Sequence, residues 1–198
     1  MNLPNKITMG RIIISIIILL LMIFPFYNVE YTFPKYLVMG RVVIDLKYII
    51  CGILFMIASV SDFLDGRLAR KNNLVTDFGK VMDAIADKIL VNGVLIIMAV
   101  DGVLPVIIPV VIITRDTIVD SIKMVAGSKG KVVAASIWGK IKTVCMMIGI
   151  TLLFFNNLPF ELLNFSLGYY LVIIACVLSI YSGVQYFYTN KDLIMSKM

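Results

Sequence analysis

The sequence predicts an all-α integral membrane protein with six transmembrane helices, and three observations predict it. Hydrophobic residues make up 61% of the 198 residues and charged residues only 15%, against about 45–50% and about 25% in soluble domains. The mean hydropathy is +1.00. Apolar segments long enough to cross a hydrocarbon core of about 30 Å recur along the chain. We therefore expect a single transmembrane domain over residues 1–198.

The first apolar segment, 12–27, follows Lys6 and Arg11. A basic stretch before an apolar one is also typical of a signal peptide. Here the segment ends in bulky aromatic residues and lacks the small residues of a cleavage site, so we expect a retained helix.

Five more spans follow, separated by polar or turn-forming residues. The separators are the polar stretch 28–45, the dipeptide Asp101-Gly102, the Gly- and Lys-containing stretch 126–135 and the turn at 156–159. The expected spans are 46–60 with a continuation into Asp62, 78–100, 104–114, 143–155 and 167–188.

Basic residues predict the orientation. If both termini lie on one side, that side holds all of the eighteen Lys and Arg residues except Lys35, Arg41 and Lys47. Cytoplasmic loops carry such an excess, so we expect both termini in the cytoplasm. The net charge of +6 is explained by these loops and by anionic lipid, and we expect no nucleic-acid partner.

The composition also excludes some chemistry. The chain has no histidine, which rules out a histidine base, nucleophile or metal ligand. Cys51, Cys145 and Cys176 lie far apart in apolar sequence and are interpreted as small buried residues, not as a zinc site or a disulfide framework.

Acidic residues occur where a membrane helix should avoid them. Two series have helical spacing and form one stripe each: Asp62, Asp65, Gly66, Ala69 and Arg70, then Gly79, Asp83 and Asp87. The short linker between them makes the two helices antiparallel neighbours whose stripes can face each other. We expect four carboxylates in one cavity, with Gly66, Ala69 and Gly79 small enough for a ligand to approach.

Divalent cations are the expected partners of these carboxylates. Each charge at bilayer depth costs about 2.5–3.5 kcal/mol, and neighbouring carboxylates repel. Mg²⁺ or Mn²⁺ prefers oxygen ligands, and two ions would balance four carboxylates and still bind phosphate oxygens. Three alternatives stay open: solvated or ion-paired acids at helix ends, a divalent-cation or proton-coupled transporter, and a non-catalytic membrane scaffold.

The two stripes resemble the signature of the CDP-alcohol phosphotransferases. The run DFLDGRLAR at 62–70, followed by Gly79, Asp83 and Asp87, matches all eight defining positions without a gap. The resemblance implies the fold of that family, with six transmembrane helices in a homodimer in the bacterial cell membrane. It implies a reaction in which a CDP-linked phosphodiester is cleaved and CMP is released.

The resemblance also implies roles for individual residues. Asp62, Asp65 and Asp83 would hold one ion, and Asp62, Asp83 and Asp87 the other. Asp87 would also be the base that deprotonates the acceptor hydroxyl. Gly66, Arg70 and Thr76 would contact the CDP moiety, beside the small residues Ala69 and Gly79.

Softer motifs indicate the subfamily. The runs NLPNKITMGR at 2–11, GKIKT at 139–143 and SGVQYFY at 182–188 are similar to those of bacterial phosphatidylglycerophosphate synthases. This implies CDP-diacylglycerol and glycerol 3-phosphate as substrates. Thr114-Arg115-Asp116-Thr117 departs from the Arg-Glu-Phe form of many members, so cardiolipin, phosphatidylserine and phosphatidylinositol-phosphate synthases stay as alternatives.

A small dianionic acceptor needs fixed cations. Arg115, Lys140 and Lys142 are the candidates for the acceptor phosphate. The alternatives are attraction of the lysines to anionic headgroups and pairing of Arg115 with neighbouring acids. Asp116, Asp120 and Lys123 share a stripe and could form a purely structural network.

Overall fold

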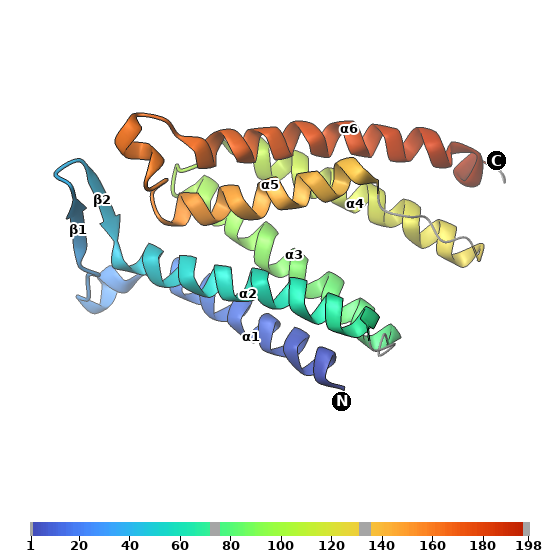
Figure 1. Ribbon diagram of the computed structural model, residues 1–198, viewed down its shortest axis with the longest axis horizontal. Helices are drawn as coiled ribbons and strands as arrows, with labels where there is room; N and C mark the ends of the chain where they lie inside the picture. The colour runs from blue at the N-terminus through green and yellow to red at the C-terminus, as the bar shows by residue number, and fades with distance from the viewer. Residues whose placement is uncertain (1, 72–75, 131–135, 196–198) are drawn as a thin grey trace.

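The computed structural model describes residues 2–71, 76–130 and 136–195. In these ranges there are six α-helices, two 3₁₀ helices and one antiparallel hairpin (Figure 1). The elements are α1 (Leu3–Ile23), η1 (Phe26–Val29), β1 (Lys35–Val38), β2 (Val42–Asp45), α2 (Leu46–Lys71), α3 (Asp77–Val100), α4 (Ile107–Ser128), α5 (Ile137–Phe154), η2 (Phe160–Leu163) and α6 (Leu167–Met195).

All six expected helices are present, with shifted ends. α4 begins at Ile107 rather than at 104, because Val103 and Leu104 donate their backbone N–H groups to the Met98 carbonyl and close the turn after α3. α4 then extends into the expected loop, to Ser128. α5 begins earlier than expected because the Ser136 hydroxyl accepts a hydrogen bond from the Gly139 N–H and caps the helix.

Four helices are long and apolar enough to cross a membrane: the segments Pro4–Ile23, Leu46–Arg67, Ile137–Phe154 and Leu167–Lys191. The other two, α3 and α4, are comparably long but carry several ionised residues. The composition of α3 and α4 therefore does not identify them as spans. The coarse class, a mostly helical membrane protein, is confirmed.

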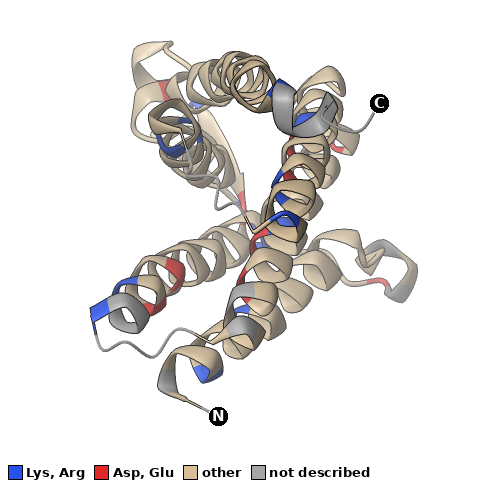
Figure 2. Ribbon diagram, turned by 90° about the vertical axis from the view of Figure 1, so that its right-hand side faces the viewer, with Lys and Arg blue, Asp and Glu red and all other residues tan. Residues whose placement is uncertain are grey.

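The helices form two groups. α1 packs against α2 and α3, whereas α6 packs against α5 and α4. Both chain ends lie at one end of the molecule and the hairpin at the other (Figure 1). Figure 2 looks at the end with the two termini and shows Lys, Arg, Asp and Glu on several helices there. One expectation is wrong: α2 and α3 pack chiefly on α1 rather than on each other.

Segment 28–45 was expected only as a polar interruption, but it contains the hairpin. β1 and β2 pair from Lys35 opposite Asp45 to Val38 opposite Val42. The connection turns through Gly40, whose φ of +68° favours glycine. The Asn156 side chain donates a 2.9 Å hydrogen bond to the Val43 carbonyl, which ties the hairpin to the turn between α5 and α6.

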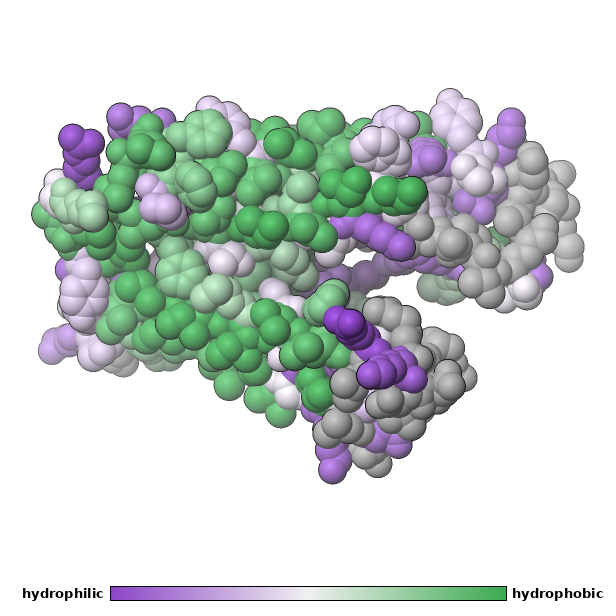
Figure 3. Space-filling model, in the orientation of Figure 1, coloured by the Kyte–Doolittle hydropathy of each residue, from purple (hydrophilic) through white to green (hydrophobic). Residues whose placement is uncertain are grey.

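Among the described residues, a large apolar cluster in the interior includes Phe55, Leu90, Ile112 and Phe154, and a small second cluster consists of Val119, Ile122 and Tyr186. The face of the molecule in Figure 3 is also largely apolar, as the green colour shows, which suits a protein surrounded by lipid. α5 and α6 approach closely through glycine: a Cβ on Gly149 would lie 3.0 Å from the Gly168 carbonyl oxygen. Small residues at such contacts let membrane helices pack backbone to backbone.

Candidate active site

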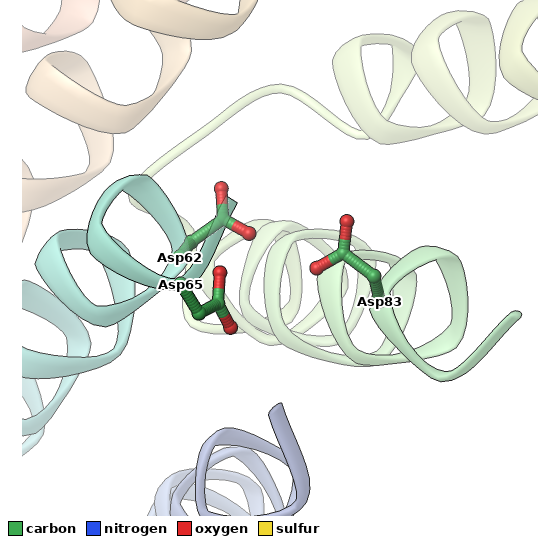
Figure 4. Close-up of side chains that lie close together, drawn as sticks. All are labelled: Asp62, Asp65 and Asp83. Carbon is green, nitrogen blue, oxygen red and sulfur yellow. The ribbon is translucent and has the colours of Figure 1, made fainter. Parts of the chain in front are cut away.

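Three of the predicted carboxylates meet between helices. Asp62 and Asp65 come from α2 and Asp83 from α3, and one oxygen of each lies within 4.8 Å of the others (Figure 4). Asp65 is buried, Asp62 is half-buried and Asp83 is exposed. Helical spacing on each helix and the antiparallel arrangement of the two helices produce this convergence. Three hard oxygen ligands in this geometry fit a divalent cation such as Mg²⁺ or Mn²⁺.

Asp87 lies one helical turn beyond Asp83, half-buried on α3. Among the described residues, the three carboxylates that lie close enough to share an ion are those of Asp62, Asp65 and Asp83, without Asp87. Asp87 instead lines the neighbouring cavity. Three of the four predicted carboxylates thus converge within 4.8 Å, and Asp87, one helical turn further along α3, lines the adjoining cavity.

Arg11 of α1 lies against the carboxylates. Its guanidinium pairs with Oδ1 of Asp62 through one terminal nitrogen and with Oδ1 of Asp83 through the other. The Arg11 side chain is only 1% exposed. α1 thus connects the two helices that carry the acids, in agreement with its packing on both.

α1 supplies other polar contacts at this end. The Thr8 hydroxyl donates a 3.1 Å hydrogen bond to Oδ2 of Asp65. The Asn5 side-chain amide donates a 3.1 Å hydrogen bond to the Thr76 hydroxyl. Thr76 in turn caps α3 by accepting from the Gly79 N–H at 3.0 Å. A Cβ on Gly79 would lie 2.7 Å from Oδ1 of Asn5, so a larger residue here would displace the Asn5 side chain.

The predicted nucleotide-binding residues are only partly described. Gly66 lies half-buried on α2, next to Asp65. Thr76 and Gly79 form the capped start of α3 described above. The side chains of Ala69 and Arg70 lie outside the described part of the structure.

A cavity of about 1090 Å³ opens beside the carboxylates, between α3, α4 and α5. Figure 3 shows a hollow lined with hydrophilic residues at the end of the molecule that holds both termini. Three carboxylates and five cations line the cavity: Asp87, Asp116 and Asp120, with Lys88, Arg115, Lys123, Lys140 and Lys142. This excess of positive charge suits an anionic ligand.

Two of the predicted acceptor-binding cations are already paired. Lys142 is buried, and its Nζ lies 2.8 Å from both Oδ1 and Oδ2 of Asp116. Arg115 contacts Oδ1 of the same Asp116 at 2.8 Å. Lys140 is exposed at the rim of the cavity. The cavity therefore contains all three candidates, two of which share one carboxylate.

Comparison with known proteins identifies the family of the chain. The family model described as CDP-alcohol phosphatidyltransferase matches residues 1–181. The chain belongs to this family. The resemblance of the aspartate motif to it is thereby confirmed.

Individual relatives align with most of this chain. The CDP-diacylglycerol–glycerol-3-phosphate 3-phosphatidyltransferase of Bacillus subtilis (strain 168) is 40% identical over 191 residues, 96% of this chain and 96% of that protein. A protein of the same name from Mycoplasma genitalium is 40% identical over 156 residues, 72% of this chain and 64% of that protein. Another from Rickettsia bellii is 32% identical over 191 residues, 96% of each chain. The softer motifs predicted relatives of this name, which is confirmed.

In this CDP-alcohol phosphatidyltransferase, Ser182 and Gly183 of α6 contact the Arg115 side chain. Arg115 donates to the Ser182 hydroxyl at 2.7 Å and to the Ser179 carbonyl at 3.0 Å. A Cβ on Gly183 would lie 2.8 Å from Cγ of Arg115. Glycine therefore lets the Arg115 side chain pass along α6.

The expected network of Asp116, Asp120 and Lys123 is only partly present. Asp120 pairs with Lys123 at 3.6 Å and with Lys88 of α3, whereas Asp116 pairs with Arg115 and Lys142. Arg115 pairs with a neighbouring acid, as one of the alternatives predicts, and this acid is Asp116.

Sequence reasoning missed the contribution of α1. Asn5, Thr8, Arg11 and Ser15 are all buried although they are polar. Their spacing places them along one helix face, so a polar stripe in an otherwise apolar helix was the available signal. The motif 2–11 by itself indicates only the subfamily, and its contact with the aspartates depends on how α1 packs.

Proposed function

We propose that this protein transfers the phosphatidyl group of CDP-diacylglycerol to glycerol 3-phosphate, which yields phosphatidylglycerophosphate and CMP. In this reaction the acceptor hydroxyl oxygen bonds to the phosphorus that carries the diacylglycerol. The bond from that phosphorus to the oxygen of the CMP phosphate breaks, and the hydroxyl proton goes to a base. Membership of the family, with its aspartates converging at one site, supports this proposal over a divalent-cation transporter.

The donor would bind at the aspartates. Asp62, Asp65 and Asp83 would hold one Mg²⁺ or Mn²⁺ ion, and Asp62, Asp83 and Asp87 a second. When bound, such ions neutralise phosphate charge and stabilise the attacking and leaving oxygens. The hard oxygen ligands and the lack of histidine favour these metals.

The cytidine and phosphate groups of the donor would lie along the small residues of the motif. Gly66, Ala69 and Gly79 leave room for a nucleotide against the backbone, and Thr76 starts α3 beside them. Arg70 suits a phosphate because its guanidinium offers two parallel N–H donors.

Asp87 is proposed as the base. It lines the cavity rather than joining the three converging carboxylates. That location is where an acceptor hydroxyl would enter, and no histidine exists in the chain to take its proton. A positioned carboxylate is the remaining candidate for general-base catalysis.

The acceptor phosphate would bind at Arg115, Lys140 and Lys142. Glycerol 3-phosphate is a small dianion, and the cavity with its cations adjoins Asp87. Because Asp116 pairs with both Arg115 and Lys142, the incoming phosphate would share or replace these ion pairs. Arg115 is held at a fixed position by Ser179 and Ser182, which suits recognition of a small anion.

We also propose that all six helices span the membrane as one domain, 1–198, with both termini and the active site in the cytoplasm, and that the protein is a homodimer. The common end of the two termini and the distribution of Lys and Arg support the orientation. Helices α3 and α4 carry their charges toward the site, which explains why composition alone does not identify them as spans.

The deciding experiment offers purified protein CDP-diacylglycerol with different acceptors and measures CMP release. Glycerol 3-phosphate should support the fastest release. Preference for phosphatidylglycerol, serine or inositol phosphate would assign the protein to another branch of the family. No CMP release with any acceptor, from folded protein supplied with Mg²⁺, would contradict the proposal.

A further inference from the structure

Helix α1 is polar on its inner face and apolar on its outer face. Asn5, Thr8, Arg11 and Ser15 are buried, whereas Ile13, Ile16 and Leu20 are exposed. A membrane helix with polar residues inside directs them to other protein groups, because unpaired polar groups in hydrocarbon are costly. The groups that α1 contacts with Thr8 and Arg11 are the three converging aspartates.

Arg11 forms an ion pair with one oxygen of each of two carboxylates. Both ion pairs use Oδ1, one from Asp62 of α2 and one from Asp83 of α3. The contacts described for Arg11 with these two side chains are the ones to Oδ1. Thr8 acts in the same way on Asp65, since its hydroxyl holds only Oδ2. Each of the three carboxylates is thus held on one side from α1.

Burial of the Arg11 guanidinium against these acids costs free energy. Its side chain is 1% exposed. Among the described residues its buried Nε and Nη1 have no hydrogen-bond partner, and Nη1 contacts Asp62 as an ion pair. A buried guanidinium is tolerated only when paired with opposite charge. Arg11 therefore contributes to this site through its two terminal nitrogens, which contact carboxylates on two different helices.

We propose that Arg11 is a positioning residue for the metal centre: it orients Asp62 and Asp83 by binding one oxygen of each, so that the other oxygen of each is presented to a divalent ion. This inference rests on the proposed function, which supplies the ions. Residues that hold metal ligands in orientation typically change metal affinity by about 10- to 100-fold when they are removed.

Charge alone predicts the opposite result. A buried cation beside the site repels a divalent ion, so its removal would tighten metal binding by electrostatics. If Arg11 positions the ligands, its removal weakens binding although a repulsive charge is lost. The sign of the change in affinity therefore separates the two roles.

The test measures binding of Mn²⁺ alone to purified detergent-solubilised protein, from the electron paramagnetic resonance signal of free Mn²⁺. Arg11→Gln should weaken Mn²⁺ binding by about 10- to 100-fold. Ser15→Ala is the matched control: it removes a buried hydroxyl from the same face of α1, and this hydroxyl donates a hydrogen bond to the Arg11 main-chain carbonyl. The control should bind Mn²⁺ like the wild type.

Unchanged or tighter Mn²⁺ binding by monodisperse Arg11→Gln protein would overturn the inference. If that variant does not fold, Arg11→Lys decides, because it keeps the charge but cannot present the planar fork to two carboxylates. It too should bind Mn²⁺ more weakly, and wild-type affinity would overturn the inference. Failure of the wild type to bind Mn²⁺ would instead overturn the proposed metal centre.

Discussion

The ammonium group of Lys142 lies 2.8 Å from both carboxylate oxygens of Asp116. The cation from α5 is therefore held at the floor of the cavity by a carboxylate from α4, which also pairs with Arg115. A glycerol 3-phosphate dianion would enter a site whose cations are already oriented. Preorganised charges of this kind favour a ligand without the cost of ordering long side chains.

Neutralising Lys142 should weaken binding of the acceptor substrate more than binding of the donor substrate. We expect Lys142→Met to raise the KM for glycerol 3-phosphate about tenfold or more, because a charge-assisted hydrogen bond contributes about 1.5–3 kcal/mol. The KM for CDP-diacylglycerol should change little. Steady-state CMP release with each substrate varied in turn measures both.

Lys35→Gln is the control for this comparison, since Lys35 lies on β1 at the opposite end of the molecule. It should leave both KM values unchanged. Equal increases of the two KM values in Lys142→Met would assign the lysine to folding or membrane attachment.

Removal of divalent ions should stop the reaction. We expect no CMP release in EDTA and full recovery with excess Mg²⁺ or Mn²⁺, because the three converging carboxylates repel one another and, among the described residues, Arg11 pairs with only two of them. Asp62→Ala and Asp83→Ala should also abolish CMP release. Near-normal release by either folded variant would contradict the two-ion site.

Substitution of Asp87 should lower turnover without abolishing donor binding, unlike substitution of the other aspartates. Asp87→Asn keeps the shape and one ligand oxygen but removes the base, so turnover should fall by about 10²- to 10⁴-fold. CDP-diacylglycerol should still bind in Mg²⁺ and raise the thermal unfolding temperature. Loss of this stabilisation would make Asp87 chiefly a metal ligand, and normal turnover would remove it from the base role.

The contact between α5 and α6 should be sensitive to a single methyl group. A Cβ at Gly149 would lie 2.8 Å from Cγ2 of Val172 and 3.0 Å from the Gly168 carbonyl. We expect Gly149→Ala to lower the free energy of unfolding by about 1–3 kcal/mol, seen as a lower Tm in detergent. Gly10→Ala is the control because nothing lies within 4 Å of its Cβ; an equal loss there would point to a general effect of helix substitution.

The proposed orientation can be measured by labelling in intact cells. A cysteine placed at Lys35 should react with a membrane-impermeant maleimide, whereas one at Lys191 should react only after permeabilisation. The wild-type chain, with Cys51, Cys145 and Cys176, gives the background labelling. Labelling of both positions in intact cells would contradict a cytoplasmic C-terminus.

Much of the fold could be predicted because membrane helices are encoded locally. The apolar segments, the turn at Asp101-Gly102 and the helical spacing of Asp62 with Asp65 and of Asp83 with Asp87 all depend on neighbours within a few residues. The hairpin was missed because its two strands have only four residues each. Such short strands leave little periodicity to detect.

The sequence by itself determined the class of protein, the six helices, the family and the aspartates that the family motif contains. Only the tertiary structure decided that α1 packs against both α2 and α3, that Arg11 pairs with Asp62 and Asp83, and that Lys142 pairs with Asp116. The physical reason is separation along the chain. The partners of Arg11 are on other helices, 72 residues away in the case of Asp83, and no periodicity within one helix specifies which face of another it will meet.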